Sequence, residues 1–244
     1  MRTHQEHFSL SAVVPTLEAA ETLAAALSAL GERGLVGEVI VVDGGSRDET
    51  LRIARAAGAR VVEAPRGRGS QLAAGAQAAR AEWLLFLHAD CRLEAGWAEK
   101  ARAFMKAPGA AGRAGYFELR LDDPRKAARR LERIVAWRSR LLGLPWGDQG
   151  LLISRRLLES VGGFRPLPVM EDVDLVRRLG RARLAPIGAS ILASARRYRQ
   201  GGYLRRPLRN LFCLALYFLG APADRIARMY GEPREGSWRR DLGR

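Results

Sequence analysis

The sequence is poor in cysteine, histidine and aromatic residues. It has two cysteines, Cys91 and Cys213, and three histidines among 244 residues, and its aromatic content is 7%. Two cysteines so far apart form no disulfide framework and no metal-binding spacing, which is typical of proteins from a reducing compartment. The scarcity of aromatic residues also argues against a surface that stacks on single-stranded nucleic acid.

Long hydrophobic runs are missing as well. The longest uncharged apolar run, residues 211–223, has thirteen residues, whereas about 20 are needed to span a bilayer. The opening residues, MRTHQEHF, contain no apolar core of signal-peptide length. We therefore expect a cytoplasmic protein, with any membrane association limited to the inner face of the membrane.

Acidic residues are scarce in the second half of the chain. The whole sequence has 41 Lys and Arg against 26 Asp and Glu, a net charge of +15. Residues 1–122 hold 15 of each kind, so residues 123–244, with 26 basic and 11 acidic residues, carry the entire excess. This half is expected to face something anionic, either nucleic acid, a phosphorylated substrate or acidic lipid.

Two basic segments in this half are also apolar. A helix predicted over residues 124–142 has apolar residues at helical spacing and arginines on its other faces. The tail, residues 196–244, holds 12 arginines against 4 acids around the apolar run LFCLALYFL. These segments indicate one of two arrangements. Either they contact an anionic membrane surface, or the apolar run packs against protein, which is the rest of the chain or a second subunit of a homodimer.

Residues 8–90 alternate short apolar segments with helix-like segments. Strands are expected at 8–16, 37–45, 59–65 and 82–90, and helices at 17–30, 47–58 and 69–81. Strands that are apolar on both faces and alternate with helices predict an α/β fold, with a mostly parallel central sheet flanked by helices. Ligands of such a sheet bind beyond the carboxyl ends of its strands.

Polar side chains stand where two of these strands end. Asp43 precedes two glycines, where a carboxylate can accept a hydrogen bond from a nucleobase or a ribose. In LLFLHADCRL, His88 and Asp90 lie on one side of the chain if it stays extended. Asp90 is a candidate ligand for a divalent cation that also binds a diphosphate. His88 is a second metal ligand, a ribose contact or a polar group at the rim of the sheet.

Charged residues also gather before two helices. Arg66 and Arg68 lie among glycines in APRGRGSQ, where they are either diphosphate ligands or solvated arginines. Glu171, Asp172 and Asp174 begin a helix in MEDVDL, where the helix dipole alone favours acidic residues. Beside the other carboxylates, this group is a candidate source of a general base.

Six segments, taken in order and spacing, resemble the family 2 nucleotide-sugar glycosyltransferases of GT-A fold. They are SAVVPTLEAAETL, VIVVDGGSRDET, PRGRGSQLAAGAQAA, WLLFLHADCRL, GDQGLLISRR and MEDVDLVRRL, which together cover roughly residues 8–195. The sequence is most similar to a bacterial subgroup of short single-domain members with His-Ala-Asp in place of the usual Asp-x-Asp. The resemblance implies a GT-A domain over residues 1–195, with a Rossmann-like nucleotide-binding half, followed by a basic helical tail over residues 196–244.

The resemblance also implies a donor site for a UDP- or GDP-linked sugar. Asp43 would read the base, and Asp90 would bind Mg²⁺ or Mn²⁺. His88 stands where the first aspartate of the usual motif contacts the ribose or the metal. The implied nucleotide-binding residues are Pro15, Thr16, Asp43, Arg66, Arg68 and His88.

On the acceptor side, the resemblance implies a base and a lining loop. Asp172 would be the catalytic base, and the family inverts the configuration of the sugar in a single displacement. The implied acceptor-side residues are Gly147, Asp148, Gln149 and Glu171. Two other functions remain open from the sequence. One is a non-catalytic binder of nucleic acid or other anions, for which no recognised module appears. The other is nucleotidyl transfer on a similar fold.

Overall fold

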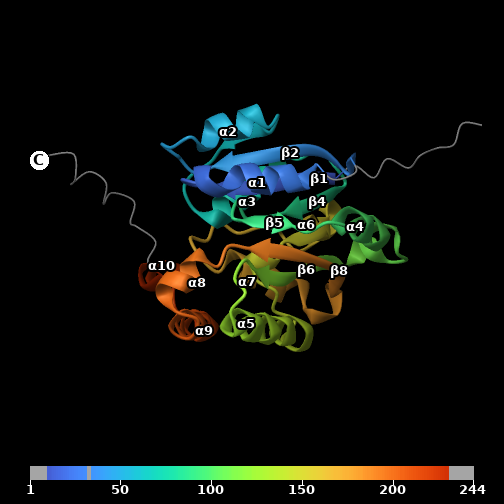
Figure 1. Ribbon diagram of the computed structural model, residues 1–244. Coiled ribbons are helices and arrows are strands. Elements are labelled where there is room, and N and C mark those ends of the chain that lie inside the picture. Colours follow the sequence, from blue (N-terminus) through green and yellow to red (C-terminus); the bar gives the residue numbers. More distant parts are fainter. Residues whose placement is uncertain (1–9, 32–33, 231–244) are drawn as a thin grey trace, which may run out of the picture.

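An eight-stranded mixed sheet runs through the centre of the protein (Figure 1). The computed structural model describes residues 10–31 and 34–230. The strands are β1 (Leu10–Thr16), β2 (Val36–Asp43), β3 (Arg60–Glu63), β4 (Trp83–Phe86), β5 (Cys91–Leu93), β6 (Ala114–Leu121), β7 (Leu151–Ser154) and β8 (Leu184–Ala193). Their order in the sheet is β3-β2-β1-β4-β7-β6-β8-β5. Neighbours pair in parallel except at β4–β7, β7–β6 and β8–β5, so the mostly parallel α/β sheet predicted from the sequence is confirmed.

Helices cover both faces of this sheet. They are α1 (Ala20–Leu30), α2 (Thr50–Ala56), α3 (Arg68–Ala78), α4 (Trp97–Lys106), α5 (Lys126–Trp137), α6 (Arg155–Ser160), α7 (Glu171–Leu179), α8 (Arg196–Gly201), α9 (Arg205–Phe218) and α10 (Ala223–Tyr230). The helix predicted over 124–142 is thus α5 followed by a π-helical turn, Arg138–Leu142.

The strand sequences explain why the sheet is buried. Every residue of β1 is buried, and alternate side chains enter two different cores. Val14 packs in a core with α1, α4 and α5, whereas Val13 packs in a core with α3, α6 and α7. Because successive side chains of a strand point to opposite faces, a strand buried on both faces has apolar residues at successive positions. The uninterrupted apolar segments in the sequence reflect this burial.

Pro15 marks the place where β1 and β4 separate. The N–H of Leu87 donates to the carbonyl of Val13 at 3.0 Å, so the backbone nitrogen of Pro15, two residues on, faces the same side. Proline has no N–H to continue that ladder, and the β1–β4 pairing ends at Val13 and Phe86. The two strands are therefore no longer hydrogen-bonded to each other beyond Leu87.

The chain turns after β4 and does not stay extended. The N–H of Cys91 donates to the carbonyl of His88 at 3.1 Å, which closes a turn over residues 88–91. The premise that His88 and Asp90 lie on one side of an extended strand is therefore wrong. The turn leads into β5, which pairs with β8 at the far edge of the sheet, and this long-range pairing was not visible in the local sequence.

The described part of the tail packs on the rest of the chain. Cys213 and Leu214 of α9 and Ile226 of α10 form a buried cluster with Val169 and Val173 next to and within α7. One side of the apolar run 211–219 is therefore buried against the chain, as one of the two alternatives predicted. None of the helices in the described ranges has the length and apolar character needed to cross a membrane.

Candidate active site

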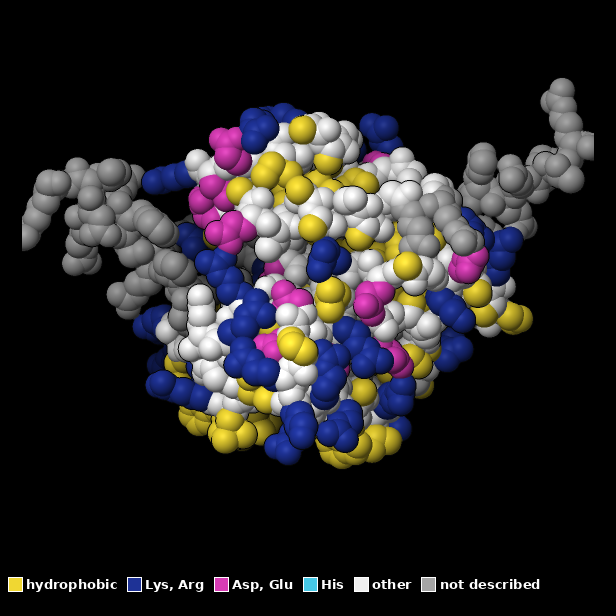
Figure 2. Space-filling view, viewed as in Figure 1, with side chains coloured by type: hydrophobic (Ala, Val, Ile, Leu, Met, Phe, Trp, Pro, Cys, Tyr) yellow, Lys and Arg dark blue, Asp and Glu magenta, His cyan; other side chains and the backbone are white. Residues whose placement is uncertain are grey.

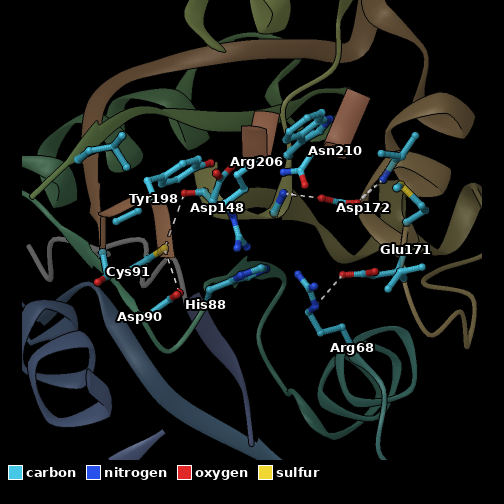
Figure 3. Close-up of a pocket in the computed structure, with 18 residues that line it drawn as sticks. Arg68, His88, Asp90, Cys91, Asp148, Glu171, Asp172, Tyr198, Arg206 and Asn210 are labelled. Atoms are coloured by element: carbon cyan, nitrogen blue, oxygen red, sulfur yellow. Dashed lines mark hydrogen bonds and ion pairs between the residues drawn. The ribbon is translucent and has the colours of Figure 1, made fainter. Parts of the chain in front are cut away.

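A pocket opens beyond the carboxyl end of β4 (Figure 3). Its walls come from the start of α3, the turn after β4, the loop before β7, the start of α7, the end of β8 and the tail helices α8 and α9. The charged and polar side chains that line it include Arg68, His88, Asp90, Asp148, Glu171, Asp172, Tyr198, Arg206 and Asn210. The strand ends thus carry the site, as expected for a sheet of this kind.

Asp172 is held in this pocket by the local structure of α7. The residue before the helix, Met170, has a φ of +65°, so the chain turns sharply into the first turn of α7. One carboxylate oxygen of Asp172, Oδ2, accepts a hydrogen bond from the N–H of Gly147 at 2.7 Å. The other, Oδ1, accepts one from the N–H of Val173 at 2.7 Å. The helix dipole favours a negative charge at this position.

Gly147 lies close to two side chains of the site. A Cβ at this position would lie 2.5 Å from Nε2 of His88 and 3.4 Å from Oδ2 of Asp172. The first distance is far below any ordinary contact, and the His88 ring stands directly over the loop. The absence of a side chain at Gly147 therefore brings the imidazole and the carboxylate to the same wall.

Asp148 places a second carboxylate inside the pocket wall. Its Oδ1 is buried, with no hydrogen-bond partner in the described part of the chain. Burial raises the pKa of Asp148 to about 6; the negative charges of Asp172 and Asp90 add to this rise, and the guanidinium of Arg138 opposes it. Asp148, Asp172 and Asp90 thus place three carboxylates around one pocket, and such oxygen ligands suit a divalent cation.

The two predicted metal ligands, His88 and Asp90, both line the pocket. In Figure 3 the His88 ring extends toward the side of Arg68 and Asp172, whereas the Asp90 carboxylate lies beside Cys91, whose Sγ is 3.7 Å from Oδ1 of Asp90. Within residues 10–31 and 34–230, no three His, Cys, Asp or Glu side chains are grouped to hold a metal ion. Mg²⁺ commonly takes one or two carboxylates and completes its shell with waters and substrate phosphates. Asp90, with the neighbouring acidic wall, fits a site of that kind.

Arg68 faces the pocket from the start of α3. Its Nε lies 3.7 Å from Oε1 of Glu171, whose side chain is almost fully buried. This ion pair joins the first turns of α3 and α7 across the pocket (Figure 3). Arg66, two residues earlier, does not line the pocket, so the structure separates the two arginines that the sequence left equivalent.

The residues predicted to hold the nucleoside lie at the ends of β1 and β2, outside the pocket lining. The Asp43 carboxylate accepts four hydrogen bonds: from the N–H of Gly45 at 2.9 Å, from the N–H and Oγ of Ser46 at 2.7 and 2.6 Å, and from Oγ1 of Thr16 at 2.9 Å. Four bonds use the full accepting capacity of a carboxylate. In this structure Asp43 therefore organises the turn after β2.

A model of glycosyl transferase family 2 matches residues 11–156 of the chain, more than half of its length. The chain belongs to this family. It is therefore a glycosyltransferase, and the alternatives of a non-catalytic anion binder and of nucleotidyl transfer are not supported. Comparison with curated protein sequences gives no match.

Solved glycosyltransferase structures share the fold. TarS 1-349 of S. aureus superposes with a TM-score of 0.63 at 16% identity, over 91% of this chain and 70% of that one. Glucosyl-3-phosphoglycerate synthase of Mycobacterium tuberculosis, in complex with Mn²⁺, UDP and glucosyl-3-phosphoglycerate, gives a TM-score of 0.56 at 26% identity, over 88% and 81%. The GT-A fold that the resemblance implied is confirmed.

Gln149 does not face the acceptor side of this glycosyltransferase. Its side chain is buried, Oε1 accepts a hydrogen bond from Oγ of Ser139 at 2.8 Å, and Nε2 donates to the carbonyl of Phe117 at 3.1 Å. It does not line the pocket, so the expectation of an acceptor contact is corrected. The short 3-10 turn Gly147–Gln149 directs Asp148 toward the pocket and Gln149 into the interior. There the Gln149 side chain links β6 to the turn after α5.

The sequence reasoning missed three pocket residues of the tail. Tyr198 of α8 and Arg206 and Asn210 of α9 line the pocket, although the tail was predicted as a segment separate from the GT-A domain. Asn210 is only 6% exposed. An asparagine directly before the apolar run 211–219 was the signal in the sequence that could have indicated this role.

Proposed function

We propose that this glycosyltransferase moves a sugar from a nucleoside diphosphate donor to an acceptor hydroxyl, with inversion at the anomeric carbon. Asp172 is the general base, and Mg²⁺ or Mn²⁺ binds at Asp90. The observation that carries the proposal is the fixed position of the Asp172 carboxylate, which the Gly147 N–H and the start of α7 hold in the same pocket as Asp90 and Arg68.

The donor diphosphate fits between the start of α3 and the turn after β4. Arg68 supplies a guanidinium, and the start of α3 adds the positive end of its helix dipole. Relatives of this fold bind UDP-sugars: TarS of S. aureus is in complex with UDP-GlcNAc, at 17% identity and a TM-score of 0.63 over 91% of this chain and 71% of that one. The donor is accordingly a UDP- or GDP-linked sugar, with the nucleoside beyond Arg68 near Thr16 and Asp43.

The cation is expected on the acidic side of the pocket. Asp90 would hold it, and the buried Oδ1 of Asp148 adds negative charge nearby. When bound, such an ion stabilises the charge that develops on the leaving diphosphate. The Mycobacterium tuberculosis synthase, in complex with Mn²⁺ and UDP, supports the use of a divalent cation. His88 then contacts the sugar or ribose from the opposite wall.

Asp172 performs the proton transfer. As the acceptor oxygen attacks the anomeric carbon, its O–H proton passes to the free lone pairs of the Asp172 carboxylate. The bond between the anomeric carbon and the diphosphate oxygen breaks in the same displacement, so the diphosphate leaves with the bonding electrons and the configuration inverts. The hydrogen bond from Gly147 leaves Oδ2 with further accepting capacity for this proton.

The neighbouring carboxylates are less suited to this role. Asp174 is bound by Arg165 at 3.1 Å and by Arg178 at 2.6 Å, and it does not line the pocket. Glu171 is 1% exposed and ion-paired with Arg68. Asp172 is the acid of this helix that lines the pocket and is partly exposed.

Two substitutions on α7 test the assignment. Asp172→Asn should lower turnover by ~10²–10⁴, the range for a positioned acid–base group, while nucleoside diphosphate affinity stays near the wild-type value. Asp174→Asn, the matched control two residues on, should lower the free energy of unfolding by about 3 kcal/mol, because it breaks a buried ion pair, and leave the turnover of folded protein near normal. Turnover would be measured by mass spectrometry of products with a panel of nucleotide sugars. If Asp172→Asn retained most of its turnover, the base would lie elsewhere.

A further inference from the structure

The exposed large hydrophobic side chains of this protein are confined to two segments. Among the described residues, all of them fall within 134–142 or 204–229. They are Ile134, Trp137, Leu141, Leu142, Leu204, Leu208, Leu211, Phe212, Phe218, Leu219 and Met229. Singly scattered apolar residues need no explanation, but a concentration in two helical segments indicates a surface that binds something.

Helix α9 carries a continuous apolar stripe on its outer side. Leu204, Leu208, Leu211 and Leu219 recur at helical spacing and are 77%, 58%, 59% and 83% exposed. The opposite side of the helix is the one that packs on α7 through buried Cys213. The helix is therefore apolar on both sides, and only one side is covered by the described chain.

Helix α5 and its π-helical turn present a second stripe. Ile134, Trp137 and Leu141 lie three and four residues apart on one side and are 62%, 57% and 48% exposed. Arg130 and Arg133, one turn earlier on the same side, are also exposed. An exposed tryptophan among arginines is typical of a helix that lies in the interface of a membrane.

Both stripes lie at one end of the molecule. In Figure 1, α5 and α9 form the lower edge, and α2 lies at the opposite end. Figure 2 shows hydrophobic side chains along this lower edge, with Lys and Arg side chains beside them. A flat surface laid against this end would meet both helices, and we call it the α5/α9 face.

Charge decides what this face binds. The exposed basic residues of α5, the turn after it and α9 are Lys126, Arg130, Arg133, Arg140 and Arg205. Of these, Arg140 is ion-paired with Glu118 at 2.6 Å. Acids oppose them weakly: Glu132, the one acid of the segment 126–142, is buried and ion-paired with Arg129 at 2.9 Å, and Asp224 is the one acid of 203–230. A second copy of this chain would set these arginines against one another, which is unfavourable. An anionic lipid surface complements them.

We propose that the α5/α9 face docks on an anionic membrane surface, with the apolar stripes in the headgroup region and the arginines on lipid phosphates. Basic residues near an anionic leaflet contribute about 1 kcal/mol each, or roughly fivefold in the partition coefficient. Docking holds α9 against the lipid while its inner side, through Arg206 and Asn210, lines the active-site pocket. The pocket wall is then anchored next to the membrane.

The full-length protein would be floated on sucrose gradients with vesicles of phosphatidylcholine alone or mixed with phosphatidylglycerol. Co-migration with the anionic vesicles, loss of that co-migration at high salt and weak binding to the neutral vesicles are expected. Protein that stays at the bottom of the gradient with both kinds of vesicle at low salt would overturn the proposal.

Two double variants locate the binding to this face. The double variant Leu208→Ser with Phe212→Ser removes part of the apolar stripe and should weaken binding to the vesicles. The double variant Arg130→Glu with Arg133→Glu reverses two charges and should weaken partitioning roughly 25-fold or more. Arg52→Glu with Arg55→Glu, on exposed positions of α2, makes the same charge change at the opposite end of the molecule. It serves as the matched control and should weaken binding far less.

Two further results would overturn the proposal. One is equal weakening by the α5 and α2 charge variants, because binding would then reflect net charge and not this face. The other is a wild-type dimer in analytical ultracentrifugation that Leu208→Ser with Phe212→Ser converts to a monomer, because the face would then be a subunit interface. Circular dichroism melts would confirm that each variant is folded. All the substituted side chains are exposed, so their melting temperatures should stay close to the wild-type value.

Discussion

The backbone N–H of Gly147 donates a hydrogen bond of 2.7 Å to the carboxylate of Asp172, 25 residues later in the chain. This bond joins the loop before β7 to the first turn of α7. The same loop contacts the His88 ring, which a Cβ at Gly147 would approach to 2.5 Å. The position of the proposed base therefore depends on a loop in which an added Cβ would displace the His88 ring or the backbone.

Gly147→Ala should reduce turnover strongly without unfolding the protein. The new methyl group would displace either the His88 ring or the loop, and either movement shifts the hydrogen bond on Asp172. A misplacement of about 1 Å at a reacting group costs on the order of 10²-fold in rate. Steady-state kinetics should show a lower kcat, and a higher KM for the donor as well if the His88 ring is the part that moves.

Gly112→Ala is the control for this substitution. A Cβ at Gly112 would meet nothing within 4 Å, and the residue has no left-handed backbone. Its turnover and melting temperature should stay near the wild-type values. Equal losses in the Gly147 and Gly112 variants would mean that the effect is a general one of alanine for glycine.

Arg68 and Arg66 should differ in their effect on donor binding. Arg68 lines the pocket and pairs with Glu171, whereas Arg66 does not line it. A charge-assisted contact to phosphate is worth about 1.5–3 kcal/mol, so Arg68→Gln should weaken nucleoside diphosphate binding at least tenfold. Arg66→Gln should change it less than twofold. Calorimetry with UDP and GDP measures both affinities and also shows which base is preferred.

Glu171 complicates the Arg68 variant, because it would be left buried with its ion pair broken. The double variant Arg68→Gln with Glu171→Gln removes both charges and should recover stability but not affinity. If the double variant also recovered affinity, Arg68 would act by neutralising Glu171 and not by contacting phosphate.

The local sequence predicted the strands and helices of the first half of the fold, and in the second half it predicted the helix that is α5. Segments 8–16, 37–45 and 59–65 became β1, β2 and β3 with shifts of a few residues at their ends, because strands buried on both faces leave an unmistakable apolar run. The short strands β5 and β7 were missed. Their stability comes from pairing with β8, β4 and β6, partners that are distant in sequence.

The site could be predicted where a residue ends a strand or begins a helix. Arg68, Asp90 and Asp172 line the pocket for that reason. Gln149 was placed wrongly, since the direction of a side chain in a short turn depends on its buried partners. Asn210 was missed because only tertiary packing brings α9 to the pocket.

Gln71 should stabilise the ends of β1 and β2, which lead into the loops of the proposed donor site. Its Nε2 donates to the carbonyls of Thr16 at 2.7 Å and Val42 at 2.8 Å, so it clamps the ends of β1 and β2. Gln71→Met should lower the free energy of unfolding by about 1–3 kcal/mol, because two buried carbonyls each lose one of their hydrogen bonds. Gln71→Glu should cost more, since a carboxylate oxygen would face both carbonyls. Urea denaturation measures both changes.

Gln77 supplies the control on the same helix. It is exposed near the end of α3, so Gln77→Glu should change the free energy of unfolding by less than about 0.5 kcal/mol. Similar losses from Gln71→Glu and Gln77→Glu would indicate an effect of charge on α3 and not the loss of the clamp.

Asp148 should make the metal-free protein less stable as the pH rises. Burial raises its pKa from 3.8 to about 6, so between these values the folded state binds a proton that the unfolded state has released. Stability therefore falls as the pH rises from about 4 to about 6 and stays lower above that range. The difference between the two values corresponds to roughly 3 kcal/mol as an upper bound.

Asp148→Asn, which cannot ionise, should remove this dependence. Compared with the wild type in the presence of a chelator, the variant should have a similar free energy of unfolding below about pH 4 and a higher one at about pH 8. Added Mn²⁺ should stabilise the wild type more than the variant, because the ion offsets the repulsion of Asp148 by Asp90 and Asp172. Urea titrations across the pH range give both comparisons. A constant difference between the two proteins at every pH would show that the Asp148 carboxyl does not ionise between about pH 4 and pH 6, and that the wall of the pocket is less acidic than the structure indicates.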